Sequence, residues 1–273
     1  MPPGYMRENS NLQTMLNSVA KRNPESSSAL LWEPDQVRLE SAVLTRFARF
    51  VSRRFGTESE SYAALHRWSL EKPEEFWQAV WEFTDVRASM LADKVLREAD
   101  QISGARWFQG ARLNYAENLL NRHEDGVALV GRLENGERRD ITWPELNAAV
   151  AYMAAALRAS GVGMGDRVAG MLPNVPETII AMLATASIGA LWSSCSPDFG
   201  VNGVLDRFGQ IDPKVLIACD GYYYTGKTID CRGKVAEVAS KLESLAATVL
   251  VPVLGGGPDV DGATGWHTYL NAV

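Results

Sequence analysis

The residues with the clearest chemical potential are Gly226-Lys227-Thr228, which end the stretch GYYYTGKT and carry the last letters of the phosphate-loop pattern GxxxxGK[ST]. A phosphate loop needs its backbone to approach the phosphates closely, and the bulky Tyr222–Tyr224 argue against such a cradle. The ammonium of Lys227, at the expected start of a helix, could instead contact a phosphate as a point charge. Lys227 is therefore a candidate phosphate contact without an ATP-binding loop around it.

The other chemistry-bearing residue types are scattered rather than clustered. His66, His123 and His267 form no HExxH pair and no Cys/His group at metal spacing. No GxSxG turn is present, so the sequence offers no serine nucleophile of the hydrolase type. We therefore expect neither a metal site nor a catalytic triad in these residues.

The three cysteines, Cys195, Cys219 and Cys231, lie on or beside predicted strands and share no CxxC spacing. Cysteines in such positions are predicted to be buried, reduced thiols, which is typical of a cytoplasmic protein. The N-terminus has no apolar segment following a basic one, so no signal peptide is expected.

The elements that must hold these residues alternate between short apolar runs and helical runs. Short strands alternating with helices are the pattern of βαβ units on a parallel sheet, so the sequence predicts an α/β fold. The predicted strands are Arg167–Leu172, Leu191–Ser194, Lys214–Cys219 and Thr248–Leu254. The predicted helices are Asn174–Ile188, Asn202–Ile211 and Thr228–Leu245, with Asn174 and Glu177 interpreted as N-cap and N3 of the first.

Ligands of such sheets bind beyond the carboxyl ends of the strands. The loops Pro197–Gly200 and Asp220–Lys227 follow two of the predicted strands and are the segments expected to face a ligand. After the last strand, Gly255 to Gly265 is interpreted as a flexible connector, and no finished element is expected beyond it.

A hairpin and a capped helix are predicted ahead of the sheet. Val127–Leu133 and Arg138–Thr142 flank Asn135-Gly136, the dipeptide favoured in type I′ turns. Thr142 and Glu145 have the spacing of a capping box that opens a helix over Trp143–Ala159. The glycines at 161, 163 and 165 follow a helix and precede a strand, which favours a helix C-terminus over a phosphate cradle.

The segment that precedes the hairpin has helical periodicity. An apolar stripe beginning after Pro34 predicts one helix, with the basic strip formed by Arg46, Arg49 and Arg53 as its solvated face. The aromatic residues predicted to form a core there are Tyr62, Trp68, Phe76, Trp77 and Trp81.

Composition bounds the function classes. The 273 residues are 46% hydrophobic and 22% charged, as in a folded globular protein. A net charge of −6 provides no general attraction to nucleic acid or to an acidic membrane. The uncharged stretch from Thr178 to Pro197 is interrupted by Gly189 and several hydroxyl residues, which predicts a buried helix followed by a strand rather than a membrane span.

Three sequence blocks resemble one family. WFQGARLNYAENLLNRH, DITWPELN and the segment 166–227 resemble the acyl-CoA synthetases of the adenylate-forming superfamily, over about residues 34–254. SSCSPDFG followed by GYYYTGK is the feature that is similar to the acetoacetate-activating branch rather than the acetate-activating branch. The polar residues 1–33 are predicted to form a mobile tail. The resemblance implies a helical N-terminal segment at 34–118 and part of the AMP-binding domain at 119–273.

The resemblance also implies a reaction and a site. A carboxylate, acetoacetate or a similar short acid, attacks ATP with the help of Mg²⁺ to give an acyl-adenylate, and the thiol of coenzyme A (CoA) then displaces AMP. In acetate-activating relatives CoA meets the loop that corresponds to Ser196–Gly200, so Asp198 and Phe199 become candidate CoA contacts. A basic pair of those relatives falls on Tyr224 and Lys227, of which only Lys227 keeps the charge.

The family's phosphate loop, of the type SGTTGxPK, and its small domain with the catalytic lysine are expected beyond Val273. The resemblance thus implies an incomplete N-terminal part of an acid–thiol ligase, without a catalytic residue of its own and inactive by itself. A second hypothesis is a non-catalytic module that binds CoA or docks on a partner through an exposed sheet edge. A nicotinamide-binding fold is disfavoured because no GxGxxG follows a strand.

Overall fold

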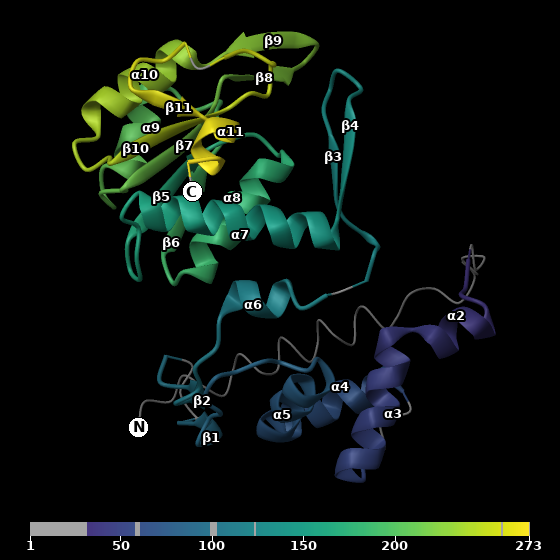
Figure 1. Ribbon diagram of the computed structural model, residues 1–273. Coiled ribbons are helices and arrows are strands. Elements are labelled where there is room, and N and C mark those ends of the chain that lie inside the picture. Colours follow the sequence, from purple (N-terminus) through teal and green to yellow (C-terminus); the bar gives the residue numbers. More distant parts are fainter. Residues whose placement is uncertain (1–31, 58–60, 99–102, 123, 258, 273) are drawn as a thin grey trace, which may run out of the picture. The chain divides into compact units, whose positions relative to one another are not determined.

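The computed structural model describes residues 32–57, 61–98, 103–122, 124–257 and 259–272. The chain divides into two compact units, Met1–Phe83 and Thr84–Val273 (Figure 1). The tail expected at 1–33 lies outside the described residues except for Trp32 and Glu33. The boundary expected between 118 and 119 stays a prediction.

The described part of the first unit is helical. Its helices are α2 (Gln36–Ser41), α3 (Val43–Phe55), α4 (Tyr62–Glu71) and α5 (Pro73–Phe83). The single helix expected after Pro34 is wrong, because Ala42 has extended backbone (ψ 138°) and separates α2 from α3. The unit's buried side chains are Phe47, Val51, Leu65, Trp68 and Ala79.

The aromatic core predicted for this unit is only partly confirmed. Trp68 is buried and Phe76 packs against it with ring centroids 6.0 Å apart. Tyr62 is 72% exposed and Trp77 is 43% exposed, so helical spacing alone overstated the number of buried rings.

The second unit contains a five-stranded parallel sheet in the order β11-β10-β7-β5-β6 (Figure 1). The strands are β5 (Arg167–Met171), β6 (Leu191–Cys195), β7 (Val215–Cys219), β10 (Ala247–Val251) and β11 (Ala263–Gly265). The central strand β7 is buried along its whole length, as expected for a parallel sheet covered on both faces. The predicted α/β class is confirmed.

Helices cover both faces of this sheet. They are α7 (Trp143–Ala159), α8 (Pro176–Ser187), α9 (Val201–Phe208), α10 (Arg232–Lys241) and α11 (Trp266–Leu270). The chain moves outward from β5 to β6 and then back across to β7, and right-handed crossovers place α8 on one face and α9 and α10 on the other. Consistently, α7 packs against α8 and α11, whereas α9 packs against α10.

Strand β6 is an edge strand of this sheet, and one of its side chains covers its neighbour. A Cβ added at Gly170 of β5 would lie 2.5 Å from the ring of Trp192 on β6. The indole therefore lies directly over the bare backbone at Gly170, an arrangement in which an aromatic side chain covers a strand glycine.

Short antiparallel pairs and one small helix complete the described part of this unit. They are β1 (Lys94–Arg97) with β2 (Arg106–Gln109), β3 (Val127–Arg132) with β4 (Arg138–Thr142), β8 (Gly221–Tyr224) with β9 (Lys227–Asp230), and α6 (Tyr115–Leu119). The predicted β3–β4 hairpin is confirmed, but the type I′ turn is wrong because only Gly136 has a positive φ (+88°). The β8–β9 hairpin carries this turn instead, with Thr225 at φ +50° and Gly226 at φ +71°.

Two further predictions at helix and strand ends need correction. Residue Val175, not Asn174, is the N-cap of α8, because Pro176 occupies the first helical position and holds the preceding residue extended. The connector expected over Gly255–Gly265 instead includes β11, which pairs with β10 and leads into α11. The capping box of α7 is confirmed, with Thr142 accepting from the Glu145 backbone and Glu145 accepting from the Thr142 backbone.

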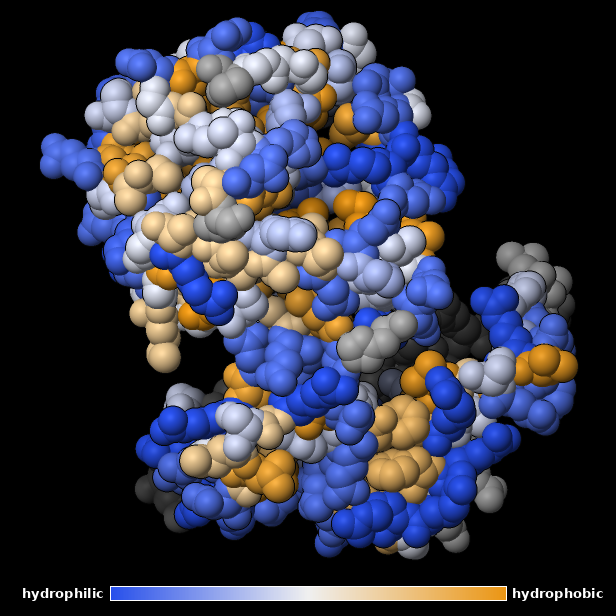
Figure 2. Space-filling model, in the orientation of Figure 1, coloured by the Kyte–Doolittle hydropathy of each residue, from blue (hydrophilic) through white to orange (hydrophobic). Residues whose placement is uncertain are grey.

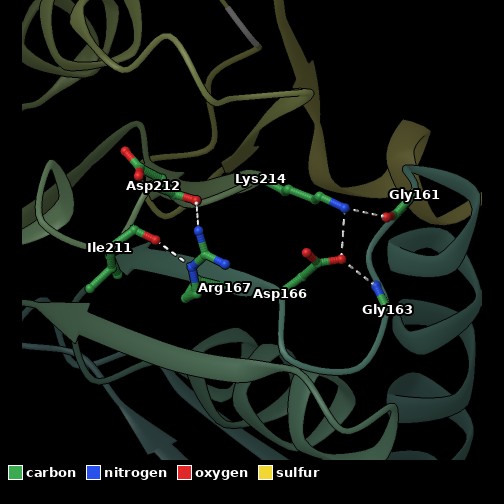
Figure 3. Close-up of polar contacts among 7 residues, drawn as sticks. All are labelled: Gly161, Gly163, Asp166, Arg167, Ile211, Asp212 and Lys214. Carbon is green, nitrogen blue, oxygen red and sulfur yellow. Dashed lines mark hydrogen bonds and ion pairs between the residues drawn. The ribbon is translucent and has the colours of Figure 1, made fainter.

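A polar network joins the segments at the amino edge of the sheet (Figure 3). The ammonium of Lys214, ahead of β7, donates to Asp166 Oδ2 (2.7 Å) and to the Gly161 carbonyl (3.1 Å). Asp166 also accepts from Gly163 N (2.8 Å), so the carboxylate ties the turn after α7 to the start of two strands. Next to it, the Arg167 guanidinium donates to the carbonyls of Ile211 and Asp212.

On the face seen in Figure 2, hydrophobic residues lie in small separate areas among hydrophilic ones. Within the described residues, no helix is long and apolar enough to cross a membrane.

Candidate functional site

The loop Ser196–Gly200 follows β6 at the carboxyl edge of the sheet, where the sequence predicts a ligand-facing segment. Its turn is closed locally, because Ser196 Oγ lies 3.0 Å from Asp198 Oδ2 and accepts from Asp198 N at 3.2 Å. Lys234 of α10 donates to the Pro197 carbonyl at 2.5 Å. The loop is therefore held by the hydroxyl of Ser196 and by the ammonium of Lys234 on α10.

Asp198 is fixed as a carboxylate by its neighbours. The hydroxyl of Tyr222 on β8 donates to it, and this bond, with that of Ser196, holds the pKa of Asp198 below its usual range. Burial, and secondarily Asp198 itself, raises the pKa of Tyr222, so the tyrosine stays a donor at any physiological pH. Asp198 thus joins the loop to the β8–β9 hairpin.

Phe199 projects from the same loop and is 37% exposed. The guanidinium of Arg207 lies 4.0 Å from the centroid of its ring, a cation–π contact. Arg207 Nη1 also donates to the Gly203 carbonyl (2.7 Å), and a Cβ at Gly203 would meet the Phe199 ring at 3.3 Å. Arg207 and Gly203 were not singled out from the sequence, because a contact across one turn of α9 has no motif of its own.

Lys227 lies on β9, opposite Tyr224, and not at a helix N-terminus. The helix predicted over Thr228–Leu245 is wrong in its first part, because Thr228–Asp230 pairs with β8 and α10 begins only at Arg232. Aromatic and β-branched residues around the turn favour this hairpin. The Lys227 side chain is exposed, and its ammonium makes no hydrogen bond or ion pair with the residues that the structure describes.

The hairpin also shows whether the phosphate-loop pattern forms a phosphate loop. Gly221–Thr228 fits GxxxxGK[ST] letter for letter, so residue spacing does not exclude a phosphate loop. Such a loop runs from a strand into a helix, whereas these residues form two antiparallel strands joined by a two-residue turn. The match is therefore accidental, as the tyrosines indicate.

Hairpin register relates Lys227 to the loop at Asp198. Residues directly opposite one another, and residues two apart on one strand, share a face of the ladder. Lys227 pairs with Tyr224, which lies two positions from Tyr222, so Lys227 shares the face from which Tyr222 reaches Asp198. The offset along the strand is about 7 Å. The structure thus brings Asp198 and Phe199 together in one loop, with Lys227 on the adjoining hairpin face.

Asp220 is a buried carboxylate that the sequence did not reveal. It accepts from Leu254 N (2.9 Å) and Gly256 N (3.2 Å), and so holds the loop after β10 against the end of β7. The adjacent Gly221 admits no side chain, since a Cβ there would lie closer than 3.0 Å to the Ile229 carbonyl oxygen. The hydrogen bonds to Asp220 and the lack of space for a side chain at Gly221 both depend on segments that are distant in sequence.

A concavity lies at the carboxyl ends of β5 and β10. This cleft of about 150 Å³ is lined by the segments Asn174–Glu177 and Val251–Val253, the β3–β4 hairpin and His267. An ion pair between Arg139 and Glu177 (2.5 Å) spans one wall, so the arginine there is already neutralised. Among the described residues, no group of three His, Cys, Asp or Glu side chains is placed to hold a metal ion.

A parallel sheet with helices on both faces and polar loops at its carboxyl edge defines an α/β protein with an open, doubly covered sheet. A family model described as AMP-binding enzyme matches residues 116–265, more than half of the chain. A second, described as acetyl-coenzyme A synthetase N-terminus, matches residues 62–119. The chain belongs to the AMP-binding enzyme family.

The relatives carry more specific names. The chain is 49% identical over 236 residues to acetoacetyl-coenzyme A synthetase of Rhizobium meliloti, covering 85% of this chain and 36% of the relative. It is 42% identical to acetoacetyl-CoA synthetase of Danio rerio, covering 90% of this chain and 37% of the relative. The solved structure of acetoacetyl-CoA synthetase from Streptomyces lividans matches with a TM-score of 0.81 at 45% identity, over 88% of this chain and 37% of that one. The chain spans a little over a third of the length of these proteins.

Proposed function

We propose that these residues form the N-terminal portion of an ATP-dependent acetoacetate–CoA ligase. The strongest support is the similarity to the Streptomyces lividans acetoacetyl-CoA synthetase, at 45% identity and a TM-score of 0.81. In the proposed reaction the acetoacetate carboxylate attacks the α-phosphate of ATP, which releases pyrophosphate. The CoA thiol then attacks the acyl carbon of the adenylate, which releases AMP.

The test uses the product of the complete open reading frame in which these residues are encoded. We expect AMP formation that depends on both acetoacetate and CoA, with acetate a poorer substrate. No AMP with acetoacetate, or equal rates with acetate, would refute the proposal. The 273 residues alone should form no AMP, because they contain no loop of the type SGTTGxPK for the β- and γ-phosphates.

In this chain the proposed role is to contact CoA with the Ser196–Gly200 loop and the β8–β9 hairpin. Lys227 is exposed and unpaired among the described residues, so its ammonium is available to a CoA phosphate. Phe199 offers an exposed ring edge beside the Arg207 guanidinium. Asp198 carries negative charge and would repel phosphate, so we propose that it shapes the loop by accepting from Tyr222.

Calorimetric titration of the 273-residue chain with CoA tests this surface. Lys227→Met should weaken binding about fivefold, ~1 kcal/mol, the usual worth of one exposed charge pair. Lys94→Met is the matched control, since Lys94 is also an exposed strand lysine without an ion pair among the described residues. Equal effects of the two substitutions would show that Lys227 does not contact CoA. The ligase proposal would be unaffected, because the AMP assay tests it separately.

Mg²⁺ belongs to the proposed reaction, where it would neutralise the phosphates of ATP. The described residues of this chain provide no cluster suited to it, so no metal ligand and no catalytic residue is assigned here. We also propose a cytoplasmic protein, which the free thiols of Cys195, Cys219 and Cys231 support. Fractionation of cells with an antibody to the chain tests the location.

Association through the sheet edge is a further part of the proposal. Among the described strands, β6 pairs only with β5, and Leu191 on it is 57% exposed. The unpaired outer edge of a strand with apolar side chains favours pairing with a strand of another chain. Light scattering after size-exclusion chromatography should show self-association of the 273-residue chain that Leu191→Lys reduces, and an unchanged mass would contradict it.

A further inference from the structure

The tips of two hairpins meet beside the candidate CoA contact. The backbone N–H of Gly226, in the β8–β9 turn, donates to Oε2 of Glu134, in the β3–β4 turn, at 3.4 Å. The ends of these hairpins lie next to each other in Figure 1. A carboxylate oxygen is therefore bound to the amide that directly precedes Lys227 in the chain.

The turn that carries Glu134 is closed by its own hydrogen bonds. Leu133 N donates to the Glu137 carbonyl (3.0 Å) and Gly136 N donates to the Leu133 carbonyl (3.1 Å). Glu137 N also donates to Asn135 Oδ1 (3.0 Å). These bonds fix the backbone on both sides of Glu134, so the direction of its side chain is limited to a few rotamers.

The body of the β3–β4 hairpin is fixed against α8. Arg139 on β4 forms an ion pair with Glu177 of α8 at 2.5 Å. Gly131 on β3 packs so closely on α8 that a Cβ there would lie 3.1 Å from the ring of Pro176. The position of the hairpin tip therefore follows from contacts lower on the hairpin, and not from the bond to Gly226 alone.

Gly226 N–H is a donor that the β8–β9 ladder does not use. The ladder closes between Tyr224 and Lys227, and the amide of the second turn residue takes no part in it. Thr225 and Gly226 both have positive φ, which directs turn amides outward, and outward-facing amides in a turn bind anions. The Glu134 carboxylate is the anion that this amide binds in the present structure.

A phosphate oxygen suits the same position. Carboxylate and phosphate oxygens are both anionic acceptors of backbone N–H groups. The Lys227 ammonium lies on a flexible stem, so it can reach an anion held at the preceding residue. That ammonium is unpaired among the described residues, whereas the Gly226 N–H already has a partner.

We propose that Glu134 is an internal competitor of CoA at the β8–β9 turn. A CoA phosphate displaces the Glu134 carboxylate from Gly226 N–H and then binds this amide together with the Lys227 ammonium. The inference rests on the proposed contact between Lys227 and CoA. Because the bond to Glu134 is lost when the phosphate binds, and because two anions repel each other at one donor, Glu134 lowers the affinity of the turn for CoA.

The hydrogen bond between the hairpins can be tested without CoA. In NMR spectra of the 273-residue chain with 15N-labelled glycine, Glu134→Ala should shift the Gly226 amide proton upfield. Glu137→Ala is the matched control, because it removes the same charge from the same turn. Glu137 enters the described hydrogen bonds of this turn only through its backbone. A Gly226 signal that is unchanged in Glu134→Ala, or that shifts equally in both variants, overturns the inference.

Calorimetric titration with CoA tests the competition. Glu134→Ala should bind CoA about two- to fivefold more tightly than wild type, the usual effect of one exposed charge pair. Glu137→Ala should bind as wild type does. In a chain that also carries Lys227→Met, the gain from Glu134→Ala should shrink, because the two side chains act on the same phosphate.

The pattern of results separates this inference from the proposed CoA surface. If Glu134→Ala binds CoA no more tightly than Glu137→Ala, Glu134 does not compete, while a loss in Lys227→Met still supports the surface. A gain from Glu134→Ala that is equally large with Lys227→Met also overturns the inference. If neither wild type nor any variant binds CoA, the CoA surface is refuted, and the role of Glu134 with it.

Discussion

Replacing Gly221 by alanine should destabilise the protein, because no space exists for a methyl group there. The added Cβ would lie closer than 3.0 Å to both the Ile229 carbonyl oxygen and the Leu254 side chain. The oxygen cannot move alone, since it belongs to the β8–β9 ladder. Overpacking of this kind costs about 1–3 kcal/mol. A displaced strand would also weaken the two bonds to Asp220, at ~1 kcal/mol each.

The expected loss is therefore about 3–5 kcal/mol, which lowers Tm by roughly 6–20 °C for a unit of this size. Urea unfolding of the 273-residue chain, followed by circular dichroism, measures it. Gly233→Ala is the matched control, because nothing lies within 4 Å of a Cβ at that position in α10. This control should gain about 0.5–1 kcal/mol from helix propensity. A Gly221→Ala variant as stable as wild type would refute the steric argument.

Other substitutions give further expected outcomes. Thr225 has φ +50°, which costs a β-branched residue about 1–2 kcal/mol, so Thr225→Gly should raise the urea midpoint. Tyr222→Phe removes the donor to Asp198 and should weaken CoA binding about threefold to tenfold by calorimetry; unchanged binding would contradict the role given to the loop. The Lys214 hydrogen bond holds the folded pKa of Asp166 below its ordinary 3.8. The stability that wild type holds over Asp166→Asn should thus be full above that value and disappear as pH falls through the folded pKa, which urea titrations across acidic pH can check.

The sequence predicted elements that have local causes. Strands β5, β6 and β7 follow from short apolar runs, and the start of α7 follows from a capping box that lies within four residues. The loop at Asp198 was located because ligand-facing loops follow the carboxyl ends of parallel strands. These features need no knowledge of distant contacts.

The missed features depend on partners that are distant in sequence or on unusual turn residues. The β8–β9 hairpin turns at Thr225, a residue type that seldom takes positive φ, so the segment was predicted as loop and helix. Asp220 owes its role to backbone groups at Leu254 and Gly256, and the link from Tyr222 to Asp198 joins two different loops. The sequence pattern predicts neither contact, because each forms only when the folded sheet brings the two segments together.

The contact between Gly170 and Trp192 makes two positions of the chain interdependent. Alanine at position 170 would collide with the indole, yet with a small residue at 192 the same alanine would gain the usual advantage over glycine in a strand. The effects of the two substitutions should therefore not add. Which residue position 170 tolerates is thus decided by the neighbouring strand, and only sequence changes that alter both positions together can replace the glycine without loss.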